Sequence, residues 1–300
     1  MASFRAQQSV NRRKTWLLLG SMFSLVAFVV YAVALYFGEV GTSIVPIAVI
    51  IALISVWGSY WASDKIVLRM TGAQVISEND HPQLYNLVHE IVIASGLPMP
   101  KIAIVSDNAP NAFATGRDPE HAVIAFTTGL LEKMDREQIQ GVVAHELAHV
   151  ANRDTLVSAV AATTARALAL MSDLLIRMMW FGTGRNRNNN GGNPLVFIAA
   201  FLAIILAPIA ASLLKSAISR KRESLADATA VSYTRNPAGL RRALETLAAD
   251  STVVNQRSTA VAHVWIESPL DARAAARLFA THPPIEERIA LLRQMENGRL

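Results

Sequence analysis

Long hydrophobic stretches without charge alternate with mixed polar segments along this chain. Residues 15–37 and residues 42–61 contain no charged side chain, and the short turn between them carries only Glu39. A helix needs about 20 apolar residues to cross a bilayer. The pattern therefore predicts a transmembrane hairpin over residues 15–61, preceded by a polar N-terminal segment over residues 1–14.

A cleavable signal peptide is the competing interpretation of the first stretch. Ala32 and Ala34 have the spacing of the small residues at a processing site. However, the hydrophobic run continues through this site, and the second stretch follows almost at once. This continuity favours a membrane span.

A second hydrophobic hairpin is predicted over residues 155–214, made of the stretches 155–180 and 194–214. The later stretch has no charge, whereas the earlier one contains charged side chains that include Asp173 and Arg177. Charges inside a span are costly and usually face protein or water. The sequence therefore leaves open whether residues 155–180 cross the bilayer completely.

Basic residues flank the first hairpin on one side and are absent from the turn between its stretches. They are Arg12, Arg13, Lys14, Lys65 and Arg69. Because basic residues concentrate on the cytoplasmic side of membrane proteins, both termini are expected in the cytoplasm. Residues 62–154 and 215–300 are expected on the same side, as the two parts of one domain.

Composition agrees with a membrane protein. The hydrophobic fraction is 52% and the mean hydropathy is +0.31, which is too apolar for an ordinary soluble domain. The net charge of +5 raises the possibility of nucleic-acid binding, but the basic residues lie beside hydrophobic runs and no nucleic-acid motif is present. The absence of cysteine excludes disulfides, thiolate metal ligands and a cysteine nucleophile.

The polar segments predict a mixed helical and strand structure. Hydrophobic spacing indicates a helix over residues 81–95 and strands over residues 101–105 and 121–127. Asn236 followed by Pro237 predicts the start of a helix that runs to about residue 249. A last helix is expected over residues 285–295.

The connection over residues 108–116 has two interpretations. It can be an ordinary hairpin connection between the two strands. Alternatively, it ends in an extended edge at Asn111, Ala112 and Phe113, where a peptide could bind by main-chain hydrogen bonds.

The sequence His145-Glu146-x-x-His149 carries the strongest chemical signal. Asp135 and Gln138 form a capping-box pattern that opens a helix through this motif. Positions four apart lie on one helix face, so both imidazoles can reach one Zn²⁺ ion, which favours nitrogen and oxygen ligands. Glu146 can then take a proton from metal-activated water. A buried helix with two incidental histidines is the alternative.

A helix over residues 219–230 presents Glu223 and Asp227 one turn apart. Glu223 can offer a carboxylate oxygen as the third zinc ligand. Asp227 can accept a hydrogen bond from the free ring N–H of a ligating histidine and so fix its tautomer. Asn152, at the end of the zinc helix, is also expected to support the ligands. The alternative is a solvated acidic face paired with neighbouring arginines.

His282 lies between Thr281 and two prolines, just before the last predicted helix. It can be only the residue at which that helix starts. It can also approach the zinc site, either as a hydrogen-bond donor to the oxyanion that develops during catalysis or as a fourth ligand.

Together, these motifs resemble the HtpX family of heat-shock membrane metalloproteases. The resemblance covers nearly the whole chain and rests on the spans and on motifs in the same order, which are 111-NAFATG-116, 145-HELAH-149, 219-SRKRESLAD-227 and 281-THPP-284. It implies a mainly α integral membrane protein with two hydrophobic helical hairpins. Its cytoplasmic gluzincin-type zinc protease domain would contain a small β-sheet.

The resemblance also implies activity and site roles. The implied activity is that of a zinc endopeptidase of the bacterial inner membrane, which cleaves damaged or misassembled membrane proteins and holds one Zn²⁺ per chain. His145, His149 and Glu223 would be the ligands and Glu146 the base, with Asn111 on the substrate edge. Two alternatives are a prenyl-protein-type membrane endopeptidase and a membrane scaffold with a structural zinc site.

Overall fold

A computed structural model describes residues 44–156, 222–250 and 285–298, together with scattered positions between 16 and 31. The described part is mainly helical and contains one small sheet, as predicted. Its helices are α2 (Ile44–Trp61), α3 (Ser63–Thr71), α4 (Pro82–Ser95), η1 (Pro119–His121), α5 (Thr128–Lys133), α6 (Arg136–Ala151), a helical segment at 222–234, α9 (Pro237–Ala249) and α11 (Ile285–Glu296). Its strands are β1 (Gln74–Ile76), β2 (Lys101–Val105), β3 (Ala112–Thr115) and β4 (Val123–Thr127).

The sheet has the strand order β1-β2-β4-β3. β2 and β4 are parallel, whereas β1 and β3 pair antiparallel with β2 and β4, respectively. The hairpin interpretation of residues 108–116 is therefore wrong. The chain instead forms an additional strand, β3, on the outer side of β4, and this reversal makes the flanking strands run in the same direction.

The other predicted elements agree closely with the observed ones. β2 has the predicted bounds, α9 begins at Pro237, and α4 begins one residue later than expected because His81 is its N-cap. β4 begins at Val123 since the backbone N–H of His121 donates to Asp118 in a short 3-10 turn. The short elements α3, β1 and α5 were not predicted.

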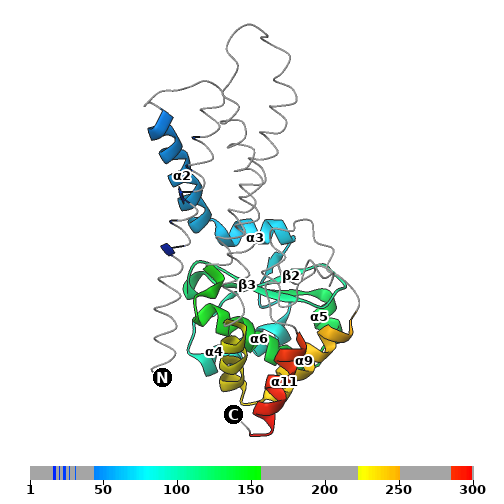
Figure 1. The fold of residues 1–300 in the computed structure, drawn as a ribbon. Helices are drawn as coiled ribbons and strands as arrows, with labels where there is room; N and C mark the ends of the chain where they lie inside the picture. Colours follow the sequence, from blue (N-terminus) through cyan, green and yellow to red (C-terminus); the bar gives the residue numbers. More distant parts are fainter. Residues whose placement is uncertain are drawn as a thin grey trace, which may run out of the picture.

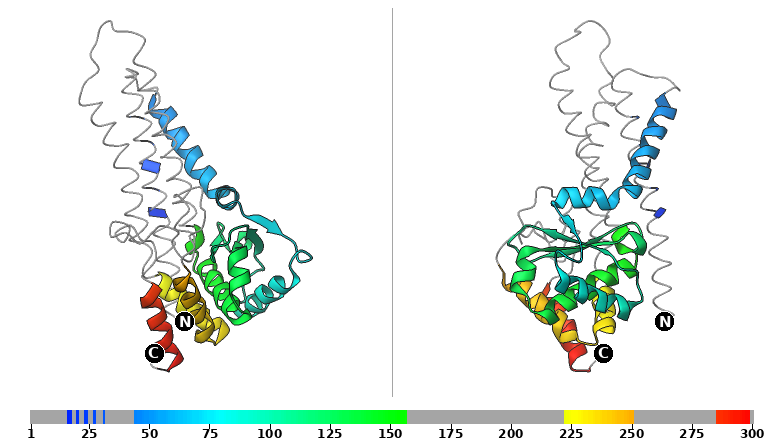
Figure 2. Two further views of the ribbon diagram at one scale, coloured as in Figure 1. Left: turned by 90° about the vertical axis from the view of Figure 1, so that its right-hand side faces the viewer. Right: turned by 180° about the vertical axis from the view of Figure 1, so that it is seen from behind.

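Helices cover both faces of the sheet, as Figures 1 and 2 show. Helices α4, α6, α9 and α11 form the larger core with one face, and alternate strand residues such as Ile102, Ile124 and Phe126 point into it. The opposite face carries Phe113 and Val105, which pack with residues of α3. The larger core fixes α6 between the sheet and the later helices.

Helices α6 and α9 cross at very short range through two glycines. A Cβ atom on Gly141 would lie 2.6 Å from the backbone nitrogen of Leu240, and one on Gly239 would lie 2.7 Å from the carbonyl oxygen of Glu137. No side chain fits at such distances, so the two backbones touch directly. This crossing brings the C-terminal helices, including α11 on α9, up to the predicted zinc helix.

Helix α2 coincides with the second predicted hydrophobic stretch. Several of its large apolar side chains are more than half exposed, namely Ile47, Ile50, Leu53, Ile54, Trp57 and Trp61. Among the residues described, no helix combines the length and hydropathy that a membrane crossing requires. Most of the predicted span 15–37 and the second hairpin beyond residue 156 lie outside the described residues.

Candidate metal centre and active site

Helix α6 begins where the sequence predicts. Asp135 accepts from the backbone N–H of Gln138, and the Gln138 side chain accepts from the backbone N–H of Asp135, which forms the capping box. The helix is buried on most sides rather than on one face. His145 is fully buried, whereas the His149 side chain is 14% exposed. Of the two histidines, only His149 therefore reaches the edge of the buried region.

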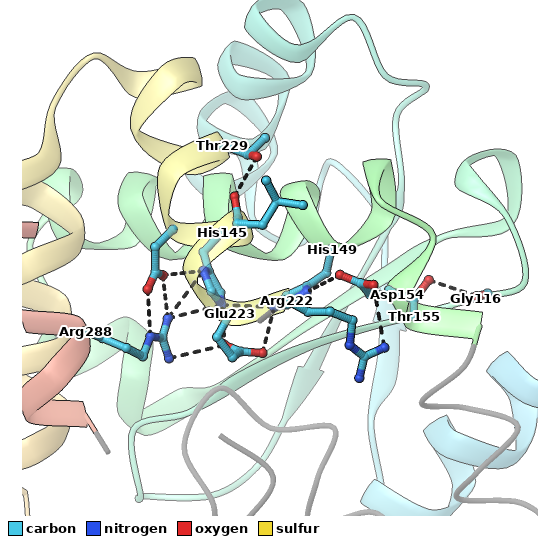
Figure 3. A network of polar contacts seen from close by, with 11 residues as sticks. Gly116, His145, His149, Asp154, Thr155, Arg222, Glu223, Thr229 and Arg288 are labelled. Carbon is cyan, nitrogen blue, oxygen red and sulfur yellow. Dashed lines mark hydrogen bonds and ion pairs between the residues drawn. The ribbon is translucent and has the colours of Figure 1, made fainter. Parts of the chain in front are cut away.

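The structure brings together three of the predicted site residues. The Nε2 atoms of His145 and His149 are 3.1 Å apart. Each also lies 3.4 Å from a different carboxylate oxygen of Glu223, which belongs to the helical segment 222–234. The ligand atoms of all three side chains lie within 4.8 Å of one another. Figure 3 shows Glu223 facing both imidazoles.

This arrangement fits a divalent metal ion. Tetrahedral zinc with nitrogen ligands at about 2.0–2.1 Å has ligand atoms about 3.3 Å apart, close to the distances between these side chains. The charges agree as well. Among the described residues, the buried carboxylates of Glu146, Glu223, Asp227 and Asp154 gather here, and Arg288 and Arg222 form ion pairs with three of them. Buried carboxylates of this kind favour a cation among them.

His145 is held by residues from two later segments of the chain. Its Nδ1–H donates to Asp227 at 2.9 Å. Arg288 of α11 donates to both oxygens of Asp227, at 2.9 and 2.7 Å, and its Nη1 lies 3.5 Å from Glu223. Arg288 is itself 3% exposed. The predicted contact of Asp227 with a histidine is thus present, and Arg288 is a residue that the sequence did not single out.

The charged pair beside His145 shifts the pKa values of this cluster. Burial by itself would raise the pKa of Asp227, but the charge of Arg288 and the bond from His145 lower it to about 2. Burial and the charge of Arg288 oppose protonation of His145, but the bonds to Asp227 and Glu223 dominate and raise its pKa. The ionised carboxylate of Asp227 therefore keeps the Nδ1 proton of His145 in place.

His149 has a corresponding carboxylate in Asp154. Its Nδ1–H donates to Oδ2 of Asp154 at 3.2 Å, and Nη1 of Arg222 lies 3.6 Å from Oδ1 of the same residue. Burial would lower the pKa of His149, but the charge of Glu223 and the bonds to Asp154 and Glu223 raise it to about 10. Without metal the imidazole is thus protonated at neutral pH, and metal binding must displace that proton.

The other predicted site residues that the structure describes lie outside the cluster of three ligands. Asn152 is the C-cap of α6 and is fully buried. Asn111, Ala112 and Phe113 are buried at the start of β3, where Asn111 Oδ1 accepts from the backbone N–H of Ala112. β3 is the outer strand beside β4 and packs against α6. His282 lies outside the described residues, so its alternatives stay predictions.

Two polar residues of the centre, Asp154 and Arg288, were not predicted from the sequence. Asp154 follows directly after the zinc helix and looks like an ordinary helix-ending residue. Arg288 follows Glu286 and Glu287 in a charged helix, which is a typical exposed pattern. The only available signal for Arg288 was that two buried acidic candidates, Glu223 and Asp227, require a cationic partner.

Comparison with known proteins agrees with this geometry. The family model "Peptidase family M48" matches residues 78–296, which include every residue of the metal centre. A Protease HtpX homolog of Syntrophobacter fumaroxidans is 46% identical over 289 residues, covering 95% of this chain and 99% of the relative. Another from Thermoanaerobacter pseudethanolicus is 43% identical over 293 residues, covering 96% of each. The resemblance to the HtpX family is confirmed.

The comparison with solved structures gives a weaker match. The crystal structure of S. mikatae Ste24p matches with a TM-score of 0.49 and 16% sequence identity. The match covers 96% of this chain and 66% of the Ste24p chain. The kinship with HtpX-type proteases supports a membrane location. From the family match and these relatives, the chain belongs to peptidase family M48 and is a metalloendopeptidase.

Proposed function

We propose that this chain is a zinc-dependent endopeptidase of the bacterial inner membrane that cleaves damaged or misassembled membrane proteins and unfolded proteins. The observation that carries the proposal is the convergence of His145, His149 and Glu223 in a chain of peptidase family M48. Three protein ligands leave a fourth tetrahedral position for water or substrate, as in catalytic zinc sites. We infer one Zn²⁺ per chain at this cluster.

Bound zinc would polarise the peptide carbonyl and lower the pKa of water to about 7. The chain's own residues then perform the proton transfers. Glu146 follows His145 in α6 and is almost fully buried, which supports a general base beside the cluster. Its carboxylate takes a proton from the attacking water and delivers it to the leaving amine. Asp227 keeps the Nδ1 proton on His145 throughout, so that Nε2 stays directed at the metal.

Strand β3 is the element that we propose for binding the substrate. It is the outermost described strand on its side of the sheet and it packs against α6. An extended peptide can add to such an edge by main-chain hydrogen bonds. Ala112 and Phe113 are fully buried in this structure, so the edge would have to be uncovered first. Because main-chain hydrogen bonds do not depend on side chains, recognition there would depend little on substrate sequence. That property suits an enzyme that removes unfolded proteins.

The inner-membrane location, with both termini and the active site in the cytoplasm, rests on the sequence. The uncharged stretches 15–37 and 42–61 are flanked by basic residues on one side only, and α2 exposes a row of large apolar side chains. Fusion of a reporter after Leu300 tests the orientation. A reporter active only in the periplasm would overturn it.

Neither alternative function is favoured. The full-length relatives at more than 40% identity are HtpX homologues, which argues against a separate prenyl-protein-processing role. Membership of a peptidase family argues against a scaffold with a structural zinc site. His282 as a permanent fourth ligand would revive the scaffold, and His282→Ala tests this by whether cleavage increases.

The decisive test is cleavage of an unfolded protein such as casein by the detergent-purified chain. Wild type, Glu146→Gln and the exposed control Glu132→Gln are compared, with bound zinc quantified in each. We expect zinc in all three and a loss of about 10²–10⁴-fold in cleavage rate only for Glu146→Gln, the usual range for a general acid–base residue. Normal cleavage by zinc-loaded Glu146→Gln would contradict the assignment.

A further inference from the structure

Each histidine of the metal centre bonds through Nδ1 to a buried carboxylate, but only one of these carboxylates was expected. Asp227 contacts His145 at 2.9 Å and Asp154 contacts His149 at 3.2 Å. Figure 3 shows Asp154 and Arg222 on one side of Glu223 and Arg288 on the other. From this geometry we propose that Asp154 is a positioning residue that orients His149 toward the metal. The proposal rests on the zinc site of the proposed function.

The backbone after α6 is shaped so that Asp154 can reach His149. Residues five apart on a continuous helix are about 140° apart around its axis, so their side chains do not meet. Here α6 ends at Ala151 with Asn152 as its C-cap, and Arg153 adopts the left-handed region with φ 57°. A non-glycine residue adopts this conformation at a steric cost. The turn carries Asp154 back over the last helical turn, where its carboxylate meets the Nδ1 atom of His149.

The segment is anchored on the neighbouring strand. The Thr155 hydroxyl donates to the carbonyl oxygen of Gly116 at 3.1 Å. Gly116 has φ 133°, and a Cβ atom there would lie only 2.5 Å from the carbonyl oxygen of His121. This glycine therefore permits the close turn at the end of β3 that presents its carbonyl to Thr155. The anchor fixes the backbone position of Asp154 relative to α6.

Arg222 holds the other oxygen of the carboxylate. Its Nη1 atom lies 3.6 Å from Oδ1 of Asp154, and the side chains are 12% and 3% exposed, respectively. Arg222 directly precedes Glu223 in the same helix. The carboxylate of Asp154 thus links the end of α6 to the helix that supplies the third ligand, and the guanidinium of Arg222 offsets its negative charge.

The chemical consequence concerns which nitrogen of His149 faces the metal. A carboxylate that accepts from Nδ1–H leaves the Nε2 lone pair free for a metal and makes that nitrogen more basic. It also stops the ring from rotating away from Glu223. Loss of such a supporting partner typically costs about 10–100-fold in metal affinity. Asp154 therefore acts through His149 and has no need to touch substrate.

The test measures Zn²⁺ affinity of the detergent-purified full chain by competition with a chromophoric chelator. Asp154→Ala should weaken affinity by about 10–100-fold. Asp154→Asn keeps an acceptor oxygen but no charge, so it should lose less, because charge-assisted bonds are about twice as strong as neutral ones. The exposed Asp80→Asn is the matched control and should leave affinity unchanged.

A second measurement separates orientation of His149 from simple support of the fold. Cobalt(II)-substituted protein has visible absorption bands that depend on ligand geometry, and these should shift in Asp154→Asn but stay unchanged in Asp80→Asn. Metal-free Asp154→Asn should unfold at a lower temperature than the wild type, because it removes the charge that pairs with the mostly buried Arg222. The cobalt bands and not the stability therefore report the orientation of His149. If Asp154→Ala does not fold, Asp154→Asn alone decides the outcome.

A double-mutant cycle with Arg222→Leu tests whether Asp154 acts through His149 or only pairs with Arg222. If Asp154 serves only to pair with Arg222, Arg222→Leu will cost as much zinc affinity as Asp154→Ala, and the double variant will cost no more. That result overturns the proposal, as does wild-type affinity in both Asp154 variants. Failure of the wild type itself to bind Zn²⁺ would instead contradict the proposed function, so the two failures are distinguishable.

Discussion

The two histidines of the centre lie one turn apart on the same helix but are completed by different parts of the chain. His149 receives its carboxylate from Asp154, five residues later in the same segment. His145 is buried against Asp227 and Arg288, and Arg288 lies 143 positions away in the sequence. The His149 half of the centre, which is His149 with Asp154, therefore obtains its carboxylate from a local turn after α6, although Arg222 and Gly116 also contact that segment. The other half exists only when α6, the helix at 222–234 and α11 pack together.

The largest effect should come from breaking both halves together through Glu223. We expect Glu223→Ala to weaken zinc affinity by about a thousandfold or more, because zinc affinities of about 10–16 kcal/mol shared among the ligands leave roughly 4 kcal/mol each. Chelator competition measures this effect. The exposed Glu132→Ala serves as control, and a loss of less than tenfold for Glu223→Ala would remove it from the ligand set.

The His145 half can be broken alone through Arg288. Replacing this buried guanidinium by methionine leaves the charge of Asp227 without its main partner. We expect Arg288→Met to destabilise the metal-free protein by about 3 kcal/mol, the usual cost of leaving a buried charge unpaired. Thermal unfolding in detergent with a metal chelator measures the change.

Two comparisons sharpen that experiment. Arg293 lies on the same helix with 61% of its side chain exposed, so Arg293→Met should cost well under 1 kcal/mol. The double variant Arg288→Met with Asp227→Asn removes both charges and should recover part of the lost stability. Equal losses for the two arginine variants would show that the His145 half does not depend on α11.

The His149 half predicts a pH dependence of metal binding. In the metal-free protein, the charge of Glu223 and the bonds to Asp154 and Glu223 overcome burial and raise the pKa of His149 to about 10. A proton therefore competes with zinc more strongly as the pH falls. Apparent zinc affinity should rise by up to about tenfold per pH unit across neutral pH and level off near pH 10.

Calorimetry in buffers of different ionisation enthalpy gives the number of protons released per zinc ion bound. At neutral pH we expect at least one. An affinity that does not change between about pH 6 and pH 9, with no proton release, would mean that His149 is neutral before metal arrives.

The smallest effect should come from a change at the start of α6, at a position that contacts neither the His145 half nor the His149 half of the centre. Asp135→Ala removes the N-cap of α6, far from the metal centre along the helix. We expect a loss of about 1 kcal/mol in stability and no change in zinc affinity. Reduced zinc affinity in this variant would mean that fraying of the first turn of α6 disturbs the histidines. Effects on the His145 half and on the His149 half could then not be measured independently.

Local signals in the sequence predicted much of this fold. The capping pattern at Asp135 and the Asn236–Pro237 pair mark helix starts that the structure has at the same positions. Strand β2 was predicted with its observed bounds. These features depend on hydrogen bonds and spacing within a few residues, so they can be inferred without tertiary contacts.

Strand β3 shows where such local reasoning failed. The sequence permits both a hairpin connection and an extended edge at residues 108–116, because spacing does not determine which strand pairs with which. The parallel pairing of β2 with β4 decides the matter, and this pairing depends on how helices pack on the sheet. Short elements such as α3 and β1 carry too few residues for a periodic signal.

The sequence by itself determined the chemistry of the centre. The spacing of His145, Glu146 and His149 on a helix, with Glu223 and Asp227 one turn apart on another, is a property of helical geometry and holds wherever the two helices lie. Only the tertiary structure decided which residues surround these side chains. Arg288 and Asp154 belong to the centre because buried carboxylates and imidazoles require partners of opposite charge or matching hydrogen-bonding capacity. Which residues supply these partners depends on how the helices pack.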